Sequence, residues 1–333
     1  ASMITRLLLP TCLLAAAGLA LLVQRPTPLA AKEAAIEIHR DVVFGRGGET
    51  DLKLDLARPR SAKGPLPAVL VLHGGGWVAG NKRDFLPIVK LLAEEGFVAV
   101  TAQYRLARPT ISGMGRRNPN PWPAQIEDAK CAVRYLRANA ERWNIDPERI
   151  AAMGFSAGGH LAMLLGTMNG ADGLEGKGGH ANQASSVQAV ISFFGPTNMG
   201  RARPKDASEI AKLPAKAKRD VLRATALSAI FGQRFMEDPT RASPLSYVDE
   251  GDAAMLLFQG TKDRLVDPEH TVSMMDALTK ASVPGKVVFH VGKGHGRGWK
   301  SDPLATDSMQ DVLDFLNQRL RPGRVRSLAA RIK

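Results

Sequence analysis

Hydrophobic and polar residues alternate in two segments near the start of this chain. The segments span residues 36–44 and 51–56, and a glycine-rich turn at 45–48 separates them. Alternation of this kind places one side of a strand against a core and the other toward solvent. The pattern therefore predicts an antiparallel hairpin at the edge of a sheet.

Later in the chain, short runs are mainly apolar, which predicts strands that are covered on both faces. These runs lie at 67–72, 96–101, 149–152, 187–194, 254–258 and 286–290. Helical patterns separate them, with apolar residues three and four positions apart. They lie at about 84–95, within 121–143, at 160–165, and at about 269–281 and 306–320. The alternation predicts an α/β fold with a mainly parallel, eight-stranded sheet and helices on both faces.

One long segment, from about 197 to 245, does not follow this alternation. It contains no predicted strand, but helical patterns occur around 207–212 and 218–231. Long loops in compact domains are usually functional, and open α/β sheets bind ligands at the carboxyl ends of their strands. We therefore expect a helical cap over that edge of the sheet. A surface excursion remote from the site is the alternative.

The first 31 residues differ in composition from the rest of the chain. A short basic start precedes an apolar stretch at 7–23, and small residues follow up to Ala31. This order is typical of a secretory signal peptide that is cleaved near Ala31, with an uncleaved N-terminal anchor as the alternative. Residues 1–2 are interpreted as a cloning remnant. We expect one secreted or periplasmic domain over 32–333, without stable membrane insertion after cleavage.

The chain is strongly basic, with 45 Lys and Arg against 32 Asp and Glu and a formal net charge of +13. Basic residues gather between 201 and 219 and in a tail at about 319–333. Neither run interleaves aromatic residues as a single-stranded nucleic-acid surface does, so no nucleic-acid partner is expected. A solvated face or a frayed tail is the interpretation, with attachment to anionic envelope polymers as the alternative. Cys131 is the only cysteine after residue 31, which excludes an internal disulfide bond in the expected domain.

The clearest chemical signal is the sequence Met-Gly-Phe-Ser-Ala-Gly-Gly-His at 153–160. An apolar strand leads into it and a helical pattern leads out, which is the context of a Gly-x-Ser-x-Gly nucleophile elbow. Small neighbours allow a turn that holds the Ser156 hydroxyl above the sheet at a helix N-terminus. A chance pentapeptide at a glycine-rich turn is the alternative. We predict that Ser156 is a nucleophile and that His160 fills the core.

A nucleophilic serine needs a base and a group that orients the base. Among seven histidines, His295 stands between glycines just beyond the last predicted strand, where it can turn toward Ser156. Asp263 directly follows the preceding strand. Asp267 is the alternative acid, but it precedes Pro268 in the pattern of a helix N-cap. The predicted order Ser156, Asp263, His295 is the order expected for α/β-hydrolases.

The sequence His-Gly-Gly-Gly at 73–76 supplies candidate donors for an oxyanion. Consecutive glycines let backbone N–H groups approach a substrate oxygen closely. The residue after the nucleophile, Ala157, contributes the other N–H group. We therefore predict an oxyanion hole made by Gly75, Gly76 and Ala157, and we expect His73 to brace this loop.

Taken together, these motifs resemble those of the α/β-hydrolase esterases. They are His-Gly-Gly-Gly-Trp at 73–77, Tyr-Arg at 104–105, Gly-Phe-Ser-Ala-Gly-Gly-His at 154–160, Gly-Thr-Lys-Asp at 260–263 and Gly-His-Gly at 294–296. The chain is similar over about 36–320 to the hormone-sensitive-lipase-like group. It is more closely similar to the bacterial carboxylesterase, acetyl-xylan and feruloyl esterase relatives of that group. The lipase-like group usually has aspartate where Phe155 stands, and this departure favours the polysaccharide-esterase relatives.

The resemblance implies a serine hydrolase for carboxylic esters that needs no metal or organic cofactor. Its expected substrate is a small-molecule or oligosaccharide ester with a short acyl group, acetyl or feruloyl. The 197–245 segment supports this expectation because it lacks the contiguous apolar face of a lid for long acyl chains. Trp77, Phe155 and Trp299 are the candidate pocket residues.

Three other functions stay open at this point. They are a lipase-like esterase for longer acyl chains, a peptidase of the same fold, and a catalytically silent binding protein. Silent relatives of such enzymes typically lose a triad member, and none is missing here. The oligomeric state is not indicated by the sequence.

Overall fold

The computed structural model describes residues 35–108, 110–112, 115–201, 231, 238–296 and 306–321. Four predicted features lie wholly or largely outside these ranges. They are the signal peptide at 1–31, most of the 197–245 segment, Trp299 and most of the basic tail at 319–333. Among the described helices, none has the length and apolar character needed to cross a membrane.

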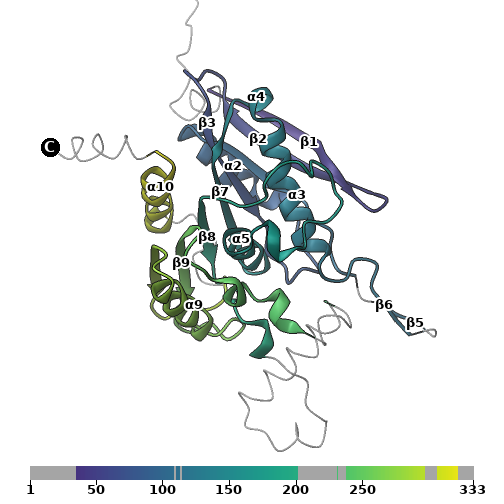
Figure 1. The fold of residues 1–333 in the computed structure, drawn as a ribbon. Coiled ribbons are helices and arrows are strands. Elements are labelled where there is room, and N and C mark those ends of the chain that lie inside the picture. The colour runs from purple at the N-terminus through teal and green to yellow at the C-terminus, as the bar shows by residue number, and fades with distance from the viewer. Residues whose placement is uncertain are drawn as a thin grey trace, which may run out of the picture.

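The apolar runs of the sequence form an eight-stranded sheet (Figure 1) with the order β1-β2-β4-β3-β7-β8-β9-β10. The strands are β1 (Ile36–Gly47), β2 (Thr50–Pro59), β3 (Leu66–Leu72), β4 (Val98–Ala102), β7 (Ile145–Phe155), β8 (Ala189–Phe193), β9 (Ala254–Gly260) and β10 (Gly285–His290). β2 is antiparallel to both β1 and β4, and the other neighbours are parallel. The predicted α/β fold class and its eight strands are confirmed.

The register of the central strands places three chemically important loops side by side. In the parallel pairs, Leu72 of β3 lies opposite Gly154 of β7 and opposite Ala102 of β4. The residues that follow these strands therefore leave the sheet together at its carboxyl edge. This edge receives the His-Gly-Gly-Gly loop, the serine elbow and the Tyr-Arg motif.

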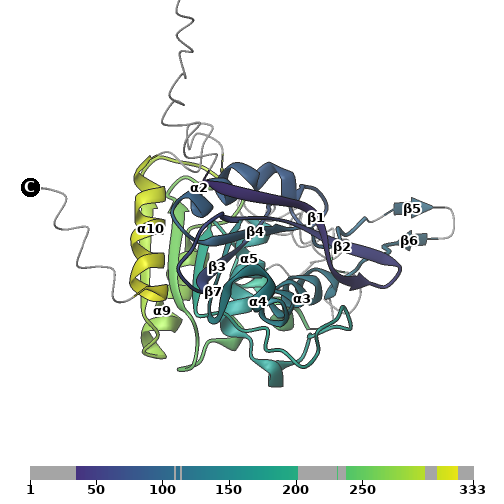
Figure 2. The same ribbon diagram turned by 90° about the horizontal axis from the view of Figure 1, so that it is seen from above.

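Helices cover both faces of the sheet, as the alternation predicted (Figure 2). One face carries α3 (Ala124–Ala138), α5 (Ala157–Thr167) and α9 (Glu269–Lys280), and the other carries α2 (Leu86–Glu94) and α10 (Thr306–Leu320). The 3₁₀ turn η1 (Lys82–Phe85) precedes α2. The helical pattern within 121–143 forms α3 and a short α4 (Ala140–Trp143), which meet at Asn139. Each helix buries its apolar stripe against the sheet, which gives two hydrophobic cores.

A short antiparallel ribbon stands apart from the sheet and was not predicted. It consists of β5 (Thr110–Ser112) and β6 (Gly115–Arg117), between β4 and α3. Figure 2 shows it extending away from the body. Strands of this length carry too few positions for an alternation to be recognised in the sequence.

The two ends of the predicted cap segment lie next to each other. The N–H of Leu245 donates to the carbonyl of Thr197 at 3.1 Å, and the N–H of Met199 donates to Ser243 Oγ at 2.8 Å. The 3₁₀ turns η3 (Met199–Arg201), η4 (Pro239–Ala242) and η5 (Pro244–Tyr247) occupy these ends. The segment thus departs and returns at one place, just beyond β8. That the rest of it covers the site stays a prediction.

Candidate active site

Ser156 occupies a strained turn between β7 and α5. Its backbone has φ 53° and ψ −116°, a conformation that non-glycine residues rarely adopt. Glycine neighbours make the turn possible, because a Cβ on Gly154 would overlap the carbonyl of Gly158, and one on Gly158 would overlap that of Leu72. The N–H of Ser156 donates to the carbonyl of Phe193 at 2.8 Å. The local geometry is that of a nucleophile elbow.

The three predicted triad residues meet at the carboxyl edge of the sheet. His295 Nε2 lies 2.8 Å from Ser156 Oγ, and His295 Nδ1 lies 2.7 Å from Asp263 Oδ2. In the arrangement suited to catalysis, Nδ1–H donates to the carboxylate and Nε2 accepts from the serine hydroxyl. The side chain of Asp263 is fully buried, whereas that of His295 keeps 16% of its surface exposed. The structure thus places the candidate nucleophile, base and orienting acid within hydrogen-bonding distance of one another in that order.

The Asp263 carboxylate is held from several sides. Its Oδ1 accepts the N–H groups of Leu265 at 2.8 Å and Val266 at 2.9 Å. Its Oδ2 accepts from Gln259 Nε2 at 3.2 Å as well as facing His295. Gln259 was not singled out in the sequence. Its inward-facing position at the end of β9, two residues before the turn to Asp263, is the signal that could have identified it.

The alternative acid, Asp267, takes a different place. Its Oδ1 accepts the N–H of Glu269 at 3.1 Å, and its carbonyl accepts that of His270 at 2.9 Å. Its side chain thus accepts an N–H at the start of α9, as a capping residue does, but the N-cap position itself is occupied by Pro268 and not by Asp267 as the sequence suggested. The helix α9 begins at Glu269, so Pro268 stands one position before the first helical residue rather than at it.

The glycine loop passes directly beside the nucleophile. A Cβ built on Gly74 would lie 2.9 Å from the carbonyl oxygen of Phe155 and 3.5 Å from Ser156 Cβ. His73, at the start of the loop, is fully buried and its Nδ1 lies 2.8 Å from the carbonyl of Gly74. Burial lowers the pKa of His73, which favours the neutral ring. The expectation that His73 braces the loop is confirmed by these contacts.

The next two glycines adopt left-handed backbone conformations. Gly75 has φ 112° and Gly76 has φ 60°, and a Cβ on Gly75 would overlap the carbonyl of Ala79. The N–H groups of Gly75 and Gly76 form no hydrogen bond with another described residue. Ala157 opens α5 immediately after the nucleophile. Gly75 and Gly76 thus follow Gly74, which passes beside Ser156, and Ala157 directly follows Ser156, while the role of all three as oxyanion donors stays a prediction.

The structure describes two of the three candidate pocket residues, Phe155 and Trp77, and places them in different hydrophobic cores. Phe155 is buried on the α2 face, stacked on Phe193 at 4.5 Å and near Phe85 at 4.8 Å. This packing corrects the expectation that Phe155 lines the pocket, because β7 directs its side chain into the core. Trp77 is also buried, but it follows the oxyanion glycines. Trp299 lies outside the described residues.

Two aromatic residues that the sequence did not single out adjoin the site. Phe194 meets the ring of His295 edge-on, with centroids 4.7 Å apart. Phe231, from within the predicted cap segment, packs edge-on against Trp77 at 4.8 Å. Neither belongs to a recognisable motif, so only the tertiary structure places them. Among the described residues, no group of His, Cys, Asp or Glu side chains is arranged to hold a metal ion.

His160 is buried in the core, as expected. Its Nε2–H donates to the carbonyl of Ala242 at 2.6 Å, and its ring lies 5.1 Å from that of Trp77. Burial lowers the pKa of His160 to about 4, from an ordinary value of 6.5. Between these two values the unfolded chain binds a proton that the folded protein excludes, so folding stability falls as the pH falls.

We expect the melting temperature of the wild type to fall more steeply than that of His160→Gln between about pH 7 and about pH 4.5. Glutamine can still donate to the Ala242 carbonyl but does not titrate. Thermal melts of both proteins at a series of pH values measure the difference. Parallel curves would contradict the assignment of a neutral, buried His160.

Comparison with known proteins places this arrangement in a family. A family model described as BD-FAE matches residues 54–278, which is more than half of the chain. The chain belongs to the BD-FAE family. The match includes the glycine loop, Ser156 and Asp263, while His295 lies beyond its end.

Several curated and solved relatives of this BD-FAE protein are named as ester hydrolases or esterases. The probable carboxylic ester hydrolase LipM of Mycobacterium tuberculosis is 27% identical over 246 residues, covering 73% of this chain and 52% of LipM. The chain thus spans about half the length of this curated relative. A carbohydrate esterase from gut microbiota, solved in truncated form, is similar with a TM-score of 0.66 and 27% identity, covering 85% of this chain and 96% of that one. These likenesses agree with the α/β-hydrolase fold.

A third similar protein is esterase Est2 of Thermogutta terrifontis. Its native structure has a TM-score of 0.68 and 26% identity, and the likeness covers 88% of this chain and 96% of that chain. Other structures of that esterase are phosphorylated by paraoxon and phosphonylated by sarin. Further structures of it contain bound butyrate or propionate.

Proposed function

We propose that this BD-FAE protein is a serine carboxylic-ester hydrolase. The observation that carries the proposal is the pair of contacts made by His295 beside the glycine loop. Its Nδ1 lies 2.7 Å from Asp263 Oδ2, and its Nε2 lies 2.8 Å from Ser156 Oγ. A hydroxyl in this setting can attack an acyl carbon at neutral pH. The naming of LipM and Est2 as esterases supports the same reaction class.

The geometry suggests how each group acts. His295 takes the Ser156 proton as Oγ attacks the ester carbonyl carbon, and the carbonyl oxygen becomes an oxyanion. The N–H groups of the loop and of Ala157 stabilise that charge. His295 then gives the proton to the departing alcohol oxygen as the C–O bond breaks. Water repeats the sequence on the acyl-enzyme, releases the carboxylic acid and restores Ser156.

Purified protein should hydrolyse p-nitrophenyl acetate, and the rate should vanish after treatment with a serine-directed phosphonate. A protein that binds esters without turnover would instead fit the silent-binder alternative. Hydrolysis of peptide substrates but not of esters would favour the peptidase alternative. No contact among the described residues favours either alternative over ester hydrolysis.

We further propose that the preferred substrates carry short acyl groups, acetyl first, on a sugar or another polar alcohol. A bulky residue, Trp77, follows the oxyanion glycines and is only 5% exposed. It is packed tightly by His160 and Phe231, which limits the room for a long acyl chain beside the loop. The likeness to a carbohydrate esterase supports the polar alcohol. Export, expected from residues 1–31, would bring the enzyme to such substrates outside the cytoplasm.

Acyl preference can be read from kcat/KM across acetyl, butyryl, octanoyl and feruloyl esters of one alcohol. We expect kcat/KM for the acetyl ester to exceed that for the octanoyl ester by about tenfold or more, since even one methylene that a pocket excludes changes kcat/KM by about 10- to 200-fold. Feruloyl esters are the nearest alternative preference. A clear rise toward octanoyl would replace this proposal with the lipase-like one.

A further inference from the structure

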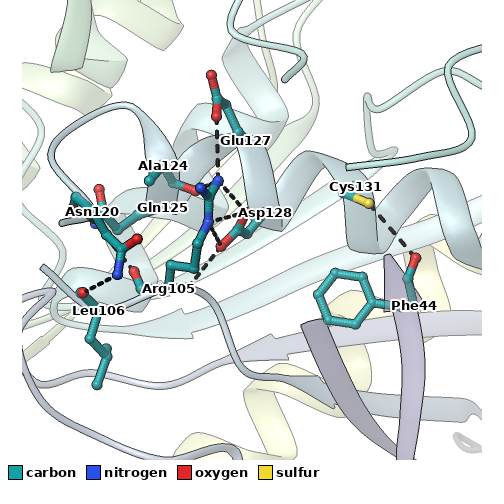
Figure 3. Close-up of polar contacts among 9 residues, drawn as sticks. All are labelled: Phe44, Arg105, Leu106, Asn120, Ala124, Gln125, Glu127, Asp128 and Cys131. Carbon is teal, nitrogen blue, oxygen red and sulfur yellow. Dashed lines mark hydrogen bonds and ion pairs between the residues drawn. The ribbon is translucent and has the colours of Figure 1, made fainter. Parts of the chain in front are cut away.

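A buried ion pair joins the Tyr-Arg motif to helix α3 (Figure 3). Arg105 Nε lies 3.0 and 2.9 Å from the two carboxylate oxygens of Asp128, and Arg105 Nη2 lies 2.7 Å from Oδ1. The backbone N–H of Arg105 also donates to Asp128 Oδ2 at 2.8 Å. The Asp128 side chain is 2% exposed, and the hydrogen bonds that it makes with described residues all go to Arg105. The carboxylate therefore fixes both the side chain and the backbone of one loop residue.

Neighbouring contacts extend this attachment along the loop (Figure 3). Gln125 of α3 donates to the carbonyl of Arg105 at 3.2 Å and to that of Asn120 at 2.9 Å. Asn120 Nδ2 in turn donates to the carbonyl of Leu106 at 3.0 Å. The segment 103–107 after β4 is thus tied to α3 by both side chains and backbone.

The same segment holds the glycine loop at both of its ends. At the start, the Tyr104 hydroxyl donates to the carbonyl of His73 at 2.9 Å, and the two rings stack with centroids 4.2 Å apart. At the end, the N–H of Ala107 donates to the carbonyl of Trp77 at 2.8 Å. The glycines at 74–76 lie between these two anchors.

A further contact fixes the ring of His73. Gln103 Oε1 accepts the N–H of Lys82 at 3.1 Å, so its Nε2 is turned toward His73 Nε2 at 3.0 Å. His73 Nε2 therefore accepts, and Nδ1–H donates to the carbonyl of Gly74. This orientation of the His73 ring depends on where the 103–107 segment lies.

We propose that Asp128 is a positioning residue for the oxyanion hole. Acting through Arg105 and the 103–107 segment, it holds the glycine loop where its N–H groups meet the developing oxyanion. The inference rests on the proposed ester hydrolysis. Oxyanion donors act only at the correct distance, and a displacement of about 1 Å can cost about 10² in rate. Asp128 has no contact with Ser156, Asp263 or His295 among its hydrogen bonds.

The variant Asp128→Asn tests the proposal with a pair of substrates, p-nitrophenyl acetate and its thiono analogue, in which sulfur replaces the carbonyl oxygen. Sulfur accepts hydrogen bonds weakly, so the oxoester depends more strongly on oxyanion donors. We expect kcat for the oxoester to fall by about 10- to 100-fold with little change in KM. The oxo-to-thiono ratio of kcat/KM should fall by about tenfold, while the pH profile set by the intact triad keeps its midpoint.

Two further ion pairs on the same helix, which share the partly exposed carboxylate of Glu175, provide the control. Lys130 and Arg134 of α3 bind Glu175 at 2.7 and 2.6 Å, away from the 103–107 segment. Glu175→Gln should lower the melting temperature, as Asp128→Asn does, but leave the oxo-to-thiono ratio unchanged. If Asp128→Asn does not fold, Arg105→Lys keeps the positive charge, loses the two-nitrogen contact and should show a smaller fall of the ratio.

The possible outcomes are distinct. Equal losses for both esters in the Asp128 and Arg105 variants, or an equal change of ratio in Glu175→Gln, would overturn the positioning role. An unaltered ratio in every variant would also overturn it, while leaving ester hydrolysis intact. A wild-type protein that hydrolyses neither ester would instead remove the proposed function on which the inference rests.

Discussion

Replacing Ser156 with alanine should lower kcat for p-nitrophenyl acetate by about five to six orders of magnitude. The change removes the atom that faces His295 Nε2 at 2.8 Å, and no hydroxyl of another described residue is bound to that nitrogen. The glycine loop is untouched, so a small residual rate from substrate binding and oxyanion stabilisation should persist. The fold should be retained, because alanine and serine meet similar strain at the positive φ of this turn.

Initial rates and thermal melts measure the two halves of this prediction. Ser192→Ala is the matched control, since Ser192 is a buried serine on the adjacent strand β8 that belongs to no part of the triad. Its activity should stay within a few-fold of the wild type. A phosphonate probe followed by peptide mass spectrometry should label Ser156. Labelling of another serine, or substantial turnover by Ser156→Ala, would show that the nucleophile lies elsewhere.

Asp263→Asn should reduce kcat by roughly 10⁴, the effect of losing the orienting carboxylate in a serine triad. The backbone N–H groups of Leu265 and Val266 bind one oxygen of Asp263, and they should retain the amide oxygen of the variant. The amide NH₂ group then faces His295 Nδ1 and favours the tautomer that carries its proton on Nε2. Such a ring cannot accept the proton of Ser156.

Asp267→Asn is the control for this change because it lies on the same loop and removes the same charge. Asparagine is a good capping residue, so the variant should lose at most about 1 kcal/mol of stability and keep near-normal turnover. Values of kcat and melting temperature for both variants decide the assignment. Loss of turnover in Asp267→Asn with normal turnover in Asp263→Asn would reverse the two roles.

Much of the architecture follows from local patterns in the sequence. Mainly apolar runs predict buried strands because a strand covered on both faces has few positions for polar residues. The elbow is also local, since the tight turn at Ser156 requires glycines within a few residues of it. Asp263 and His295 were identifiable for a related reason. The carboxyl ends of parallel strands share one edge, so residues just after β9 and the last strand lie near Ser156.

Periodicity shows that a side chain is buried but not what surrounds it. This limit explains why Phe155 was predicted to line the pocket but lies in the core. Phe155 belongs to the elbow motif, which suggested a pocket residue. Its side chain instead packs on Phe193, on the face of the sheet that α2 and α10 cover. Gln259 and Phe194 were missed for the same reason. Their importance comes from neighbours that are distant in sequence, such as Asp263 and His295.

The sequence by itself therefore determined the α/β class, the eight strands, and the serine, acid and base as candidates. Only the tertiary structure decided that Ser156 and His295, 139 positions apart, lie 2.8 Å from each other. It also decided that the segment bound to both ends of the glycine loop is bound in turn, through Arg105, to a carboxylate on α3. The physical reason is that strand and turn formation depends on neighbouring residues. Distances within a catalytic site depend instead on the packing of whole elements, which no short stretch of sequence encodes.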